Sequence, residues 1–406
     1  MLREGDNMMG IKRSNRGAVL RILHEQGEMS RKRLAECIKL TPAAITKIVG
    51  ELIEDGLVFD GTVIPGSGVG RREVMVGLDY RSRCSLGILI NLRQAIVSAL
   101  WLDGEVIFSE EIALEPHAPV EQTVVMLCGR LMELAEEYKL PKSKILGVGI
   151  AIRGITSPDG RIMHNSFRAL DCRDYPLAEL VEKLTGHKVV IANNVRALLA
   201  AQMFLSKDHE LRSQFFMRCE YGIGAALSIN DEIWLGGTGQ CSEIGHIPII
   251  PQGGKLCSCG KTGCLETIAS PTAIREDALA ILSPEKTPIL WKIASKKGAE
   301  SITLKDVLDS AKSGDAGTAG IVNRAVSALA FALKSVIYTI DPEKIVLYGQ
   351  MFENNYYLTR LMAEMGAGVD DSHSTAIEKS AYNQILDNKA AALIMVAEFF
   401  KNGGME

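Results

Sequence analysis

A run of residues that can bind a metal ion lies at 243–266, EIGHIPIIPQGGKLCSCGKTGCLE. Its three cysteines are separated mainly by small or flexible residues, so a short loop can fold back and point their thiolates at one centre. Gly253 and Gly254 allow the turn that returns a histidine as fourth ligand. Three sulfurs and one imidazole suit a closed, structural zinc site, with His246, Cys257, Cys259 and Cys264 as ligands. The alternative is a set of ordinary buried cysteines.

The order of these residues also resembles a family signature. A Glu-x-Gly-His run from Glu243 to His246 is followed by Cys-x-Cys-Gly-x-x-Gly-Cys-x-Glu from Cys257 to Glu266. This pattern resembles that of the ROK family (repressors, open reading frames and sugar kinases). The resemblance covers nearly the whole chain, and the amino-terminal extension resembles that of the N-acetylglucosamine and glucose-regulon (Mlc-type) repressor branch. It implies structural zinc at the cysteines and histidine, and sugar hydroxyls at both glutamates and the histidine.

Further sugar contacts are implied in the segments RGITSPDG, MHNSF and VVIANN. A sugar hydroxyl both donates and accepts, so carboxylates and amides together can satisfy it in a dry cleft. Each such residue taken alone is more often an ordinary satisfied surface or core polar group, and it is their combination that indicates a sugar site. Arg196, near an expected helix start, could receive a phosphate or be a surface arginine. The expected sugar-binding residues are Gly154, Ser166, Asn193, Asn194, Glu243, His246 and Glu266.

The parts needed for phosphoryl transfer are incomplete. ROK kinases carry an Asn-Asp pair whose Asp takes the proton of the attacking hydroxyl, and the matching residues here are Asn193 and Asn194. An amide cannot accept that proton at neutral pH. The family's first phosphate turn is replaced by residues 91–94, NLRQ, and the second survives only in part at 221–225, YGIGA. We therefore expect no enzymatic activity and no catalytic residues.

The rest of the chain supplies the elements that position these residues. From residue 84 onward, strand-like and helix-like segments alternate, which indicates an α/β architecture with two lobes. The resemblance implies a ribonuclease-H-like, actin-type ATPase fold with a sugar cleft. We expect a winged helix-turn-helix domain at 1–80 and a ROK sugar-binding domain at 81–406. Its first lobe would take in about 81–190 plus the C-terminal helix, and its second about 191–385.

Residues 16–76 read as a winged helix-turn-helix. Helices are expected at 16–26, from Ser30 as N-cap, and from Thr41 as N-cap with proline at the first helical position. Strands flank a Gly-rich wing that could reach a minor groove. A three-helix interaction module is the alternative. The expected DNA-binding residues are Ser30, Arg31, Thr41, Ala43, Ala44, Thr46, Lys47, Arg71 and Arg72.

Composition agrees with a cytoplasmic regulator. Residues 1–72 hold 12 Lys and Arg against 9 Asp and Glu, whereas the whole chain of 406 residues has a net charge of −4. A basic small module on an acidic larger one is typical of a nucleic-acid-binding protein. Nine cysteines are an odd number, which favours a reducing compartment. There is no initial signal segment, and no uninterrupted apolar run approaches the ~20 residues of a membrane span.

These patterns together predict a transcriptional regulator, most simply a repressor, of sugar uptake or utilisation genes. We expect a homodimer or homotetramer that binds operator DNA and loses affinity for it when a sugar or phosphosugar closes the ROK lobes. A protein of the sugar phosphotransferase system is a further possible partner. The alternatives are an active ROK sugar kinase with an appended DNA-binding domain, and a sugar-sensing protein that no longer binds DNA.

Overall fold

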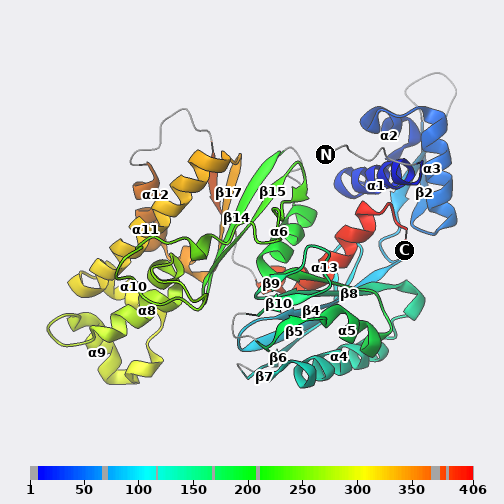
Figure 1. Ribbon diagram of the computed structural model, residues 1–406. Helices are drawn as coiled ribbons and strands as arrows, with labels where there is room; N and C mark the ends of the chain where they lie inside the picture. Colours follow the sequence, from blue (N-terminus) through cyan, green and yellow to red (C-terminus); the bar gives the residue numbers. More distant parts are fainter. Residues whose placement is uncertain are drawn as a thin grey trace. The chain divides into compact units, whose positions relative to one another are not determined.

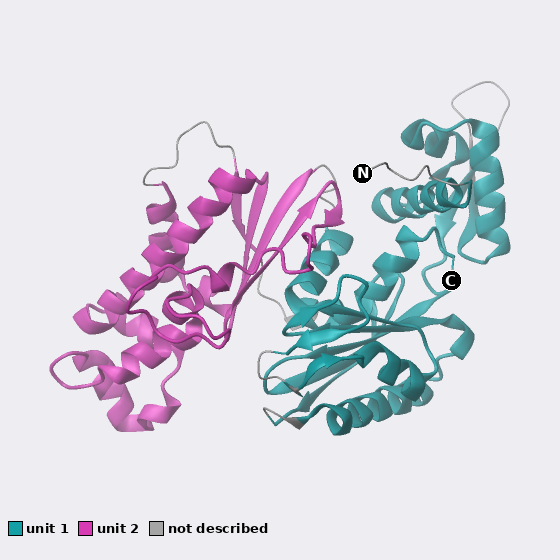
Figure 2. Cartoon of the chain, in the orientation of Figure 1, with its two compact units in different colours: residues 1–207, 385–406 teal, residues 208–384 magenta. Residues whose placement is uncertain are grey.

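The computed structural model describes residues 8–65, 72–115, 118–166, 170–206, 211–366, 375–380 and 384–405 (Figure 1). The chain divides into two compact units (Figure 2). Unit 1 comprises residues 1–207 and 385–406, and unit 2 comprises residues 208–384. The division after residue 207 comes one helix later than the lobe boundary expected near 190, because the helix 194–205 packs on strands of unit 1.

The amino-terminal part of unit 1 is a winged helix-turn-helix. Both expected caps are confirmed: Arg33 N–H donates to Ser30 Oγ at 3.3 Å, and Ala44 N–H donates to Thr41 Oγ1 at 3.2 Å. The first helix begins at residue 8 rather than 16, and its added turns are mostly exposed. The three strands pair antiparallel in the order β1-β3-β2. The elements are α1 (Met8–Gln26), β1 (Met29–Ser30), α2 (Arg31–Ile38), α3 (Pro42–Glu54), β2 (Val58–Pro65) and β3 (Arg72–Leu78).

The rest of unit 1 is built around a five-stranded sheet with helices on both faces (Figure 1), and two smaller sheets accompany it. Helices α4 and α5 pack on one face. On the other face, Gly87 of β4 pairs in register with Gly149 of β8, and a Cβ on either would lie within 2.4 Å of the backbone of α13. This glycine pair lets α13, from the far end of the chain, lie directly on the sheet. The sheet order is β13-β8-β4-β5-β6.

The bounds of these elements are β4 (Cys84–Ile90), β5 (Gln94–Trp101), β6 (Val106–Ala113), β7 (Ala118–Pro119), α4 (Val120–Glu137), η1 (Lys142–Lys144), β8 (Ile145–Ile152), β9 (Ile155–Thr156), β10 (Met163–Asn165), β11 (Leu170–Asp171), β12 (Arg173–Tyr175), α5 (Leu177–Thr185), β13 (Val189–Asn193), α6 (Asn194–Leu205) and α13 (Gln384–Lys401).

Unit 2 repeats this sheet topology. Its strand order is β16-β15-β14-β17-β18, in which β14 to β16 form an antiparallel meander and β17 and β18 add in parallel. In unit 1, β4 to β6 form the same meander, and β8 and β13 add in parallel. Two copies of one α/β topology confirm the expected fold class.

The elements of unit 2 are β14 (Ser213–Cys219), β15 (Ile223–Ile229), β16 (Glu232–Ile233), η2 (Ile244–His246), α7 (Glu266–Ala269), α8 (Pro271–Ala280), α9 (Pro288–Lys297), η3 (Ala299–Ser301), α10 (Leu304–Lys312), α11 (Ala316–Ile340), β17 (Lys344–Tyr348), η4 (Gln350–Glu353), α12 (Asn355–Gly366) and β18 (Ala376–Lys379). Within the described residues, α11 is the one helix whose length and mean hydropathy would suit a membrane span. Most of its apolar window is buried in the core of unit 2, as in the core helix of a globular domain.

Candidate functional site

The four predicted metal ligands converge in unit 2. One ligand atom from each of the residues lies within 4.8 Å of all the others. His246 Nδ1 is 3.5 Å from Cys257 Sγ, and Cys259 Sγ is 3.6 Å from Cys264 Sγ. Metal–sulfur bonds of about 2.3 Å at tetrahedral angles separate two sulfurs by about 3.8 Å, so these spacings fit one central ion. Burial raises the pKa of the Cys264 thiol, and a bound cation would act in the opposite direction by favouring the thiolate.

Backbone hydrogen bonds hold the loop around this cluster. Ile249 and Ile250 N–H both donate to Gly263 O, at 2.9 and 3.0 Å, and Cys257 N–H donates to Lys261 O at 2.7 Å. A Cβ on Gly263, whose φ is +72°, would lie 1.6 Å from Ile250 O. Only glycine permits so close an approach, so the conformation of the loop between the first and last ligand requires glycine at position 263.

The predicted sugar ligands of unit 2 flank the metal ligands. Glu243 precedes the short helix η2 that carries His246, and Glu266 begins α7 two residues after Cys264. Because Nδ1 of His246 faces the sulfurs, Nε2 is the nitrogen that a sugar hydroxyl would meet. A bound ion would therefore fix the positions of all three polar side chains.

Glu266 also contacts the remnant of the second phosphate turn. Its Oε2 accepts the N–H of Ile223 at 3.0 Å, so a carboxylate occupies one amide of the β14–β15 turn. In the same turn, Glu220 N–H donates to Gly222 O, and the Glu220 carboxylate pairs with Arg218 at 2.8 Å. The Ile223 amide of this turn is therefore already hydrogen-bonded within the protein, and the charge of Glu220 is offset by Arg218.

The predicted sugar residues of unit 1 also lie together. Asn193 Oδ1 accepts the N–H groups of Val195 and Arg196 and so caps α6, while its Nδ2 donates to Gly154 O at 2.8 Å. A Cβ on Gly154 would lie 1.9 Å from Asn165 O, next to Ser166. The hydroxyl of Ser166 donates to Leu170 O and accepts from Leu170 N–H.

Two neighbouring side chains are buried rather than exposed. Asn194 begins α6 and is 5% exposed, and Arg196 is 6% exposed. Arg196 is therefore not a surface arginine in an ordinary helix, the simpler alternative drawn from the sequence. Its position in the first turn of α6 agrees with the helix end where an anion would be favoured.

The first phosphate turn is replaced by a tight glycine-free turn. Asn91 N–H donates to Gln94 O at 2.9 Å and closes the connection of β4 to β5, and Asn91 is 9% exposed. No Gly-rich loop is left there for a nucleotide phosphate to approach.

The candidate DNA interface is formed by the exposed side of α3 and the start of α2. Thr41, Ala43, Thr46 and Lys47 are exposed and Ala44 is half-buried. Ser30 is buried, so the structure gives it a capping role. Arg31 pairs with Asp60 at 2.7 Å and ties α2 to strand β2. Arg71 lies outside the described residues, as does the side chain of Arg72. Exposed Lys32 and Arg33, not named from the sequence, add positive charge to α2.

Comparison with known proteins gives two family matches. The sequence matches the ROK family over residues 93–394 and the MarR family over residues 14–58. It is 26% identical over 343 residues to the N-acetylglucosamine repressor of Escherichia coli O6:H1, covering 84% of this chain and 82% of the repressor.

Two solved structures are similar in fold. A ROK family transcriptional regulator, homologous to the E. coli MLC protein, has a TM-score of 0.81 at 23% identity and covers 97% of this chain and 98% of its own. A ROK family glucokinase from Streptomyces griseus, in complex with glucose and AMPPNP, has a TM-score of 0.63 at 20% identity. The match covers 78% of this chain and 98% of the glucokinase. The first match spans the winged helix and both units, whereas the kinase covers a smaller share of this chain.

Proposed function

The chain belongs to the ROK family, and we propose that it is a DNA-binding transcriptional repressor of sugar uptake or utilisation genes, controlled by a sugar or phosphosugar. One observation carries the proposal. A winged helix-turn-helix matched by the MarR family stands in the same chain as a ROK domain that keeps the sugar-binding carboxylates and lacks the proton acceptor. The sequence similarity to the N-acetylglucosamine repressor, 82% of which is covered by the match, supports the proposal.

Two groups of residues are proposed to contact the effector. Glu243, His246 and Glu266 within unit 2, and separately the start of α6 within unit 1, offer the donors and acceptors that sugar hydroxyls need. The proposed sugar-binding residues are Gly154, Ser166, Asn193, Asn194, Glu243, His246 and Glu266.

The proposed ion at the four-ligand cluster is structural zinc. Three thiolates and one imidazole favour zinc over the oxygen-loving cations, and four protein ligands leave no open position for chemistry. The ion would hold the loop that carries the sugar-binding carboxylates.

We further propose that the ROK domain of this chain does not phosphorylate sugars. Asn194 stands where a kinase needs a carboxylate, the first phosphate turn is closed, and the Ile223 amide of the second is taken by Glu266. The kinase alternative rests on the similarity in fold to the glucokinase. At 20% identity, that similarity supports a shared fold and says nothing about shared activity.

The proposed organisation is a DNA-binding domain of residues 1–80 and a ROK domain of residues 81–406, acting in the cytoplasm as a homodimer or homotetramer. A two-fold dimer would match a palindromic operator. A sugar phosphotransferase-system protein could replace the small effector.

The test is a gel shift with an operator duplex that the protein selects from random DNA. N-acetylglucosamine, glucose, xylose and their phosphates are then titrated into the complex. Release of the duplex by one sugar supports the proposal. Duplex binding that no sugar or phosphosugar alters, together with sugar-dependent ATP turnover, would contradict it.

A further inference from the structure

Helix α1 of the DNA-binding domain packs against the rest of unit 1 through an aromatic cluster around His24. The imidazole stacks on Phe204, with ring centroids 4.2 Å apart and planes 25° from parallel. Phe400 of α13 and Tyr80 meet it edge-on, at centroid distances of 5.7 and 5.9 Å. His24 therefore contacts the ends of α6 and α13 and the linker that follows the winged helix.

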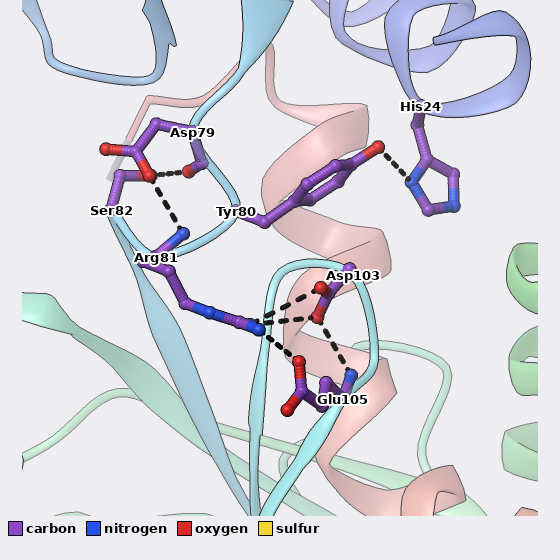
Figure 3. Close-up of polar contacts among 7 residues, drawn as sticks. All are labelled: His24, Asp79, Tyr80, Arg81, Ser82, Asp103 and Glu105. Atoms are coloured by element: carbon purple, nitrogen blue, oxygen red, sulfur yellow. Dashed lines mark hydrogen bonds and ion pairs between the residues drawn. The ribbon is translucent and has the colours of Figure 1, made fainter.

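Two hydrogen bonds fix the orientation of the imidazole. His24 Nε2 lies 3.1 Å from Phe204 O, and since a carbonyl only accepts, Nε2 carries the proton. The Tyr80 hydroxyl lies 3.4 Å from Nδ1 and, in that tautomer, donates to it (Figure 3). Burial, and then the charge of Asp103, raises the pKa of Tyr80, so the phenol keeps its proton at neutral pH.

A second set of contacts seats α1 on the end of α13. The buried Arg16 donates to Gly403 O at 2.8 Å and also pairs with Asp55 at the end of α3. A Cβ on Gly17 would lie 2.7 Å from Phe400 O, so the two backbones are in direct contact. A movement of α13 or α6 must therefore displace α1 or break these contacts.

The linker between the two parts of unit 1 is pinned as well. Arg81 pairs with Asp103 and Glu105 of the β5–β6 turn (Figure 3). Its guanidinium also lies 5.3 Å from the centroid of the Trp101 ring. Lys144 donates to Arg81 O at 2.8 Å. These contacts hold the linker between the winged helix and the five-stranded sheet in a defined position.

Helix α6 connects this junction to the proposed sugar site. It runs without interruption from Asn194 to Leu205, starting at the Asn193 cap and ending at Phe204 on His24. Twelve residues at about 1.5 Å each give a helix of about 18 Å, which moves as one body. A shift at its first turn therefore reaches α1.

We propose that His24 is the positioning residue through which α6 reports the state of the sugar site to the DNA-binding domain. The inference rests on the proposed function, because it takes the first turn of α6 as part of the effector site. His24 belongs neither to the proposed sugar ligands nor to the proposed DNA contacts. Removing its ring should therefore uncouple two sites that remain intact.

A double-mutant cycle that needs no effector tests the connection. Asn193→Asp keeps an oxygen to cap α6 but loses the donation to Gly154 O, and so disturbs the first turn. We expect this change to alter duplex affinity and hydrogen exchange of the α1 amides several-fold, and to have no effect in a His24→Ala background. Equal effects in both backgrounds, or no effect in the wild-type background, would overturn the inference.

The second measurement adds N-acetylglucosamine and its 6-phosphate as probes. In the wild type we expect duplex affinity to fall about 5- to 150-fold, the usual range of allosteric coupling. In His24→Ala, sugar and duplex should each bind within about 3-fold of wild type while the coupling factor approaches one. His187→Ala, the same substitution beyond α5, should keep full coupling.

The two measurements separate the inference from the proposed function. If the effects of Asn193→Asp and His24→Ala are non-additive but no sugar changes duplex affinity, His24 still connects α6 to the DNA-binding domain. That result would reject the proposed sugar effector. Full sugar coupling in His24→Ala would overturn the role of His24 and leave the repressor proposal standing.

Discussion

At the scale of residues, the proposed metal ligands and the proposed sugar ligands of unit 2 share one short loop. Glu266 is two positions from a predicted zinc ligand, and His246 belongs to both sets. Backbone hydrogen bonds among glycine-rich turns hold this loop, Glu266 Oε2 also accepts the N–H of Ile223, and a bound ion would add four ligand bonds at its centre. The ion should therefore govern effector binding as well as stability.

Cys259→Ala should remove the metal and the sugar response together. Structural zinc contributes on the order of 10 kcal/mol, and losing even about 3 kcal/mol would lower the Tm by about 6–12 °C in a domain of this size. Metal analysis, thermal unfolding and the operator assay check this. Cys241→Ala, a half-buried cysteine outside the cluster, is the control and should keep its metal. Purified wild-type protein without stoichiometric metal would contradict the assignment.

Glu182→Gln should weaken the turn at Arg161, which lies between the proposed sugar residues Gly154 and Ser166. Glu182 pairs bidentately with Arg161 at 2.5 and 2.6 Å, and this hydrogen bonding lowers the pKa of Glu182. A lowered pKa means that the stabilisation is fully present above the ordinary value of 4.5 and is lost as the pH falls through the lowered value. We expect a loss of about 0.5–1 kcal/mol at pH 7, because the pair is partly exposed.

Chemical denaturation at pH 7 and at pH 3 measures this difference. The gap between wild type and Glu182→Gln should shrink at the lower pH. Glu179→Gln on the exposed side of the same helix should change stability little at either pH. A gap that stays constant with pH would show that the carboxylate charge is not the cause.

At the scale of elements, the sequence predicted features that depend on neighbouring residues, such as helix caps. It did not predict packing between segments that are far apart in the chain. The caps Ser30 and Thr41 were predictable because capping depends on neighbouring residues. The first two turns of α1 were missed because Met8, Met9 and Ile11 are exposed and give no apolar periodicity. The packing of α13 on the central glycine pair could not be predicted, since it joins segments some 240 and more residues apart.

Replacing Arg71 and Arg72 together with alanine should weaken operator binding and leave sugar binding unchanged. Each arginine that neutralises a phosphate contributes about 0.9 to the slope of log affinity against log salt, so the slope should fall by about 1.8. Duplex titrations from low to physiological salt measure it. Lys292→Ala with Lys296→Ala removes the same charge from α9 and serves as control. An unchanged slope in the arginine variant would exclude the wing from the DNA contact.

At the scale of the whole molecule, the sequence identified the fold and the regulator class, because one long motif and a helix-turn-helix pattern lie in a single chain. It did not reveal how the two parts of unit 1 meet. His24, Tyr80 and Phe204 carry no motif and lie far apart in sequence, so only the folded chain brings them together. The duplicated sheet topology likewise emerges from strand pairing rather than from any repeat in the residues.

The same duplicated scaffold serves kinases and regulators, so the distinction must lie in individual groups. Binding a sugar needs hydrogen bonds, whereas transfer of phosphate also needs a proton acceptor and a held nucleotide. We expect calorimetry to detect binding of a sugar or phosphosugar, and a coupled assay to detect no sugar-dependent ATP turnover. Loss of the base alone typically costs ~100- to 10,000-fold in rate.

Asn194→Asp tests whether the base is the only missing part. An aspartate in the first turn of α6 is favoured by the helix dipole, so the variant should fold. We expect it to bind sugar and remain inactive, because the closed, glycine-free turn at 91–94 still leaves the nucleotide unheld. If this single change produced kinase activity, the missing base at position 194 would be the only cause of inactivity. Turnover by the wild type would instead favour a kinase with an appended DNA-binding domain.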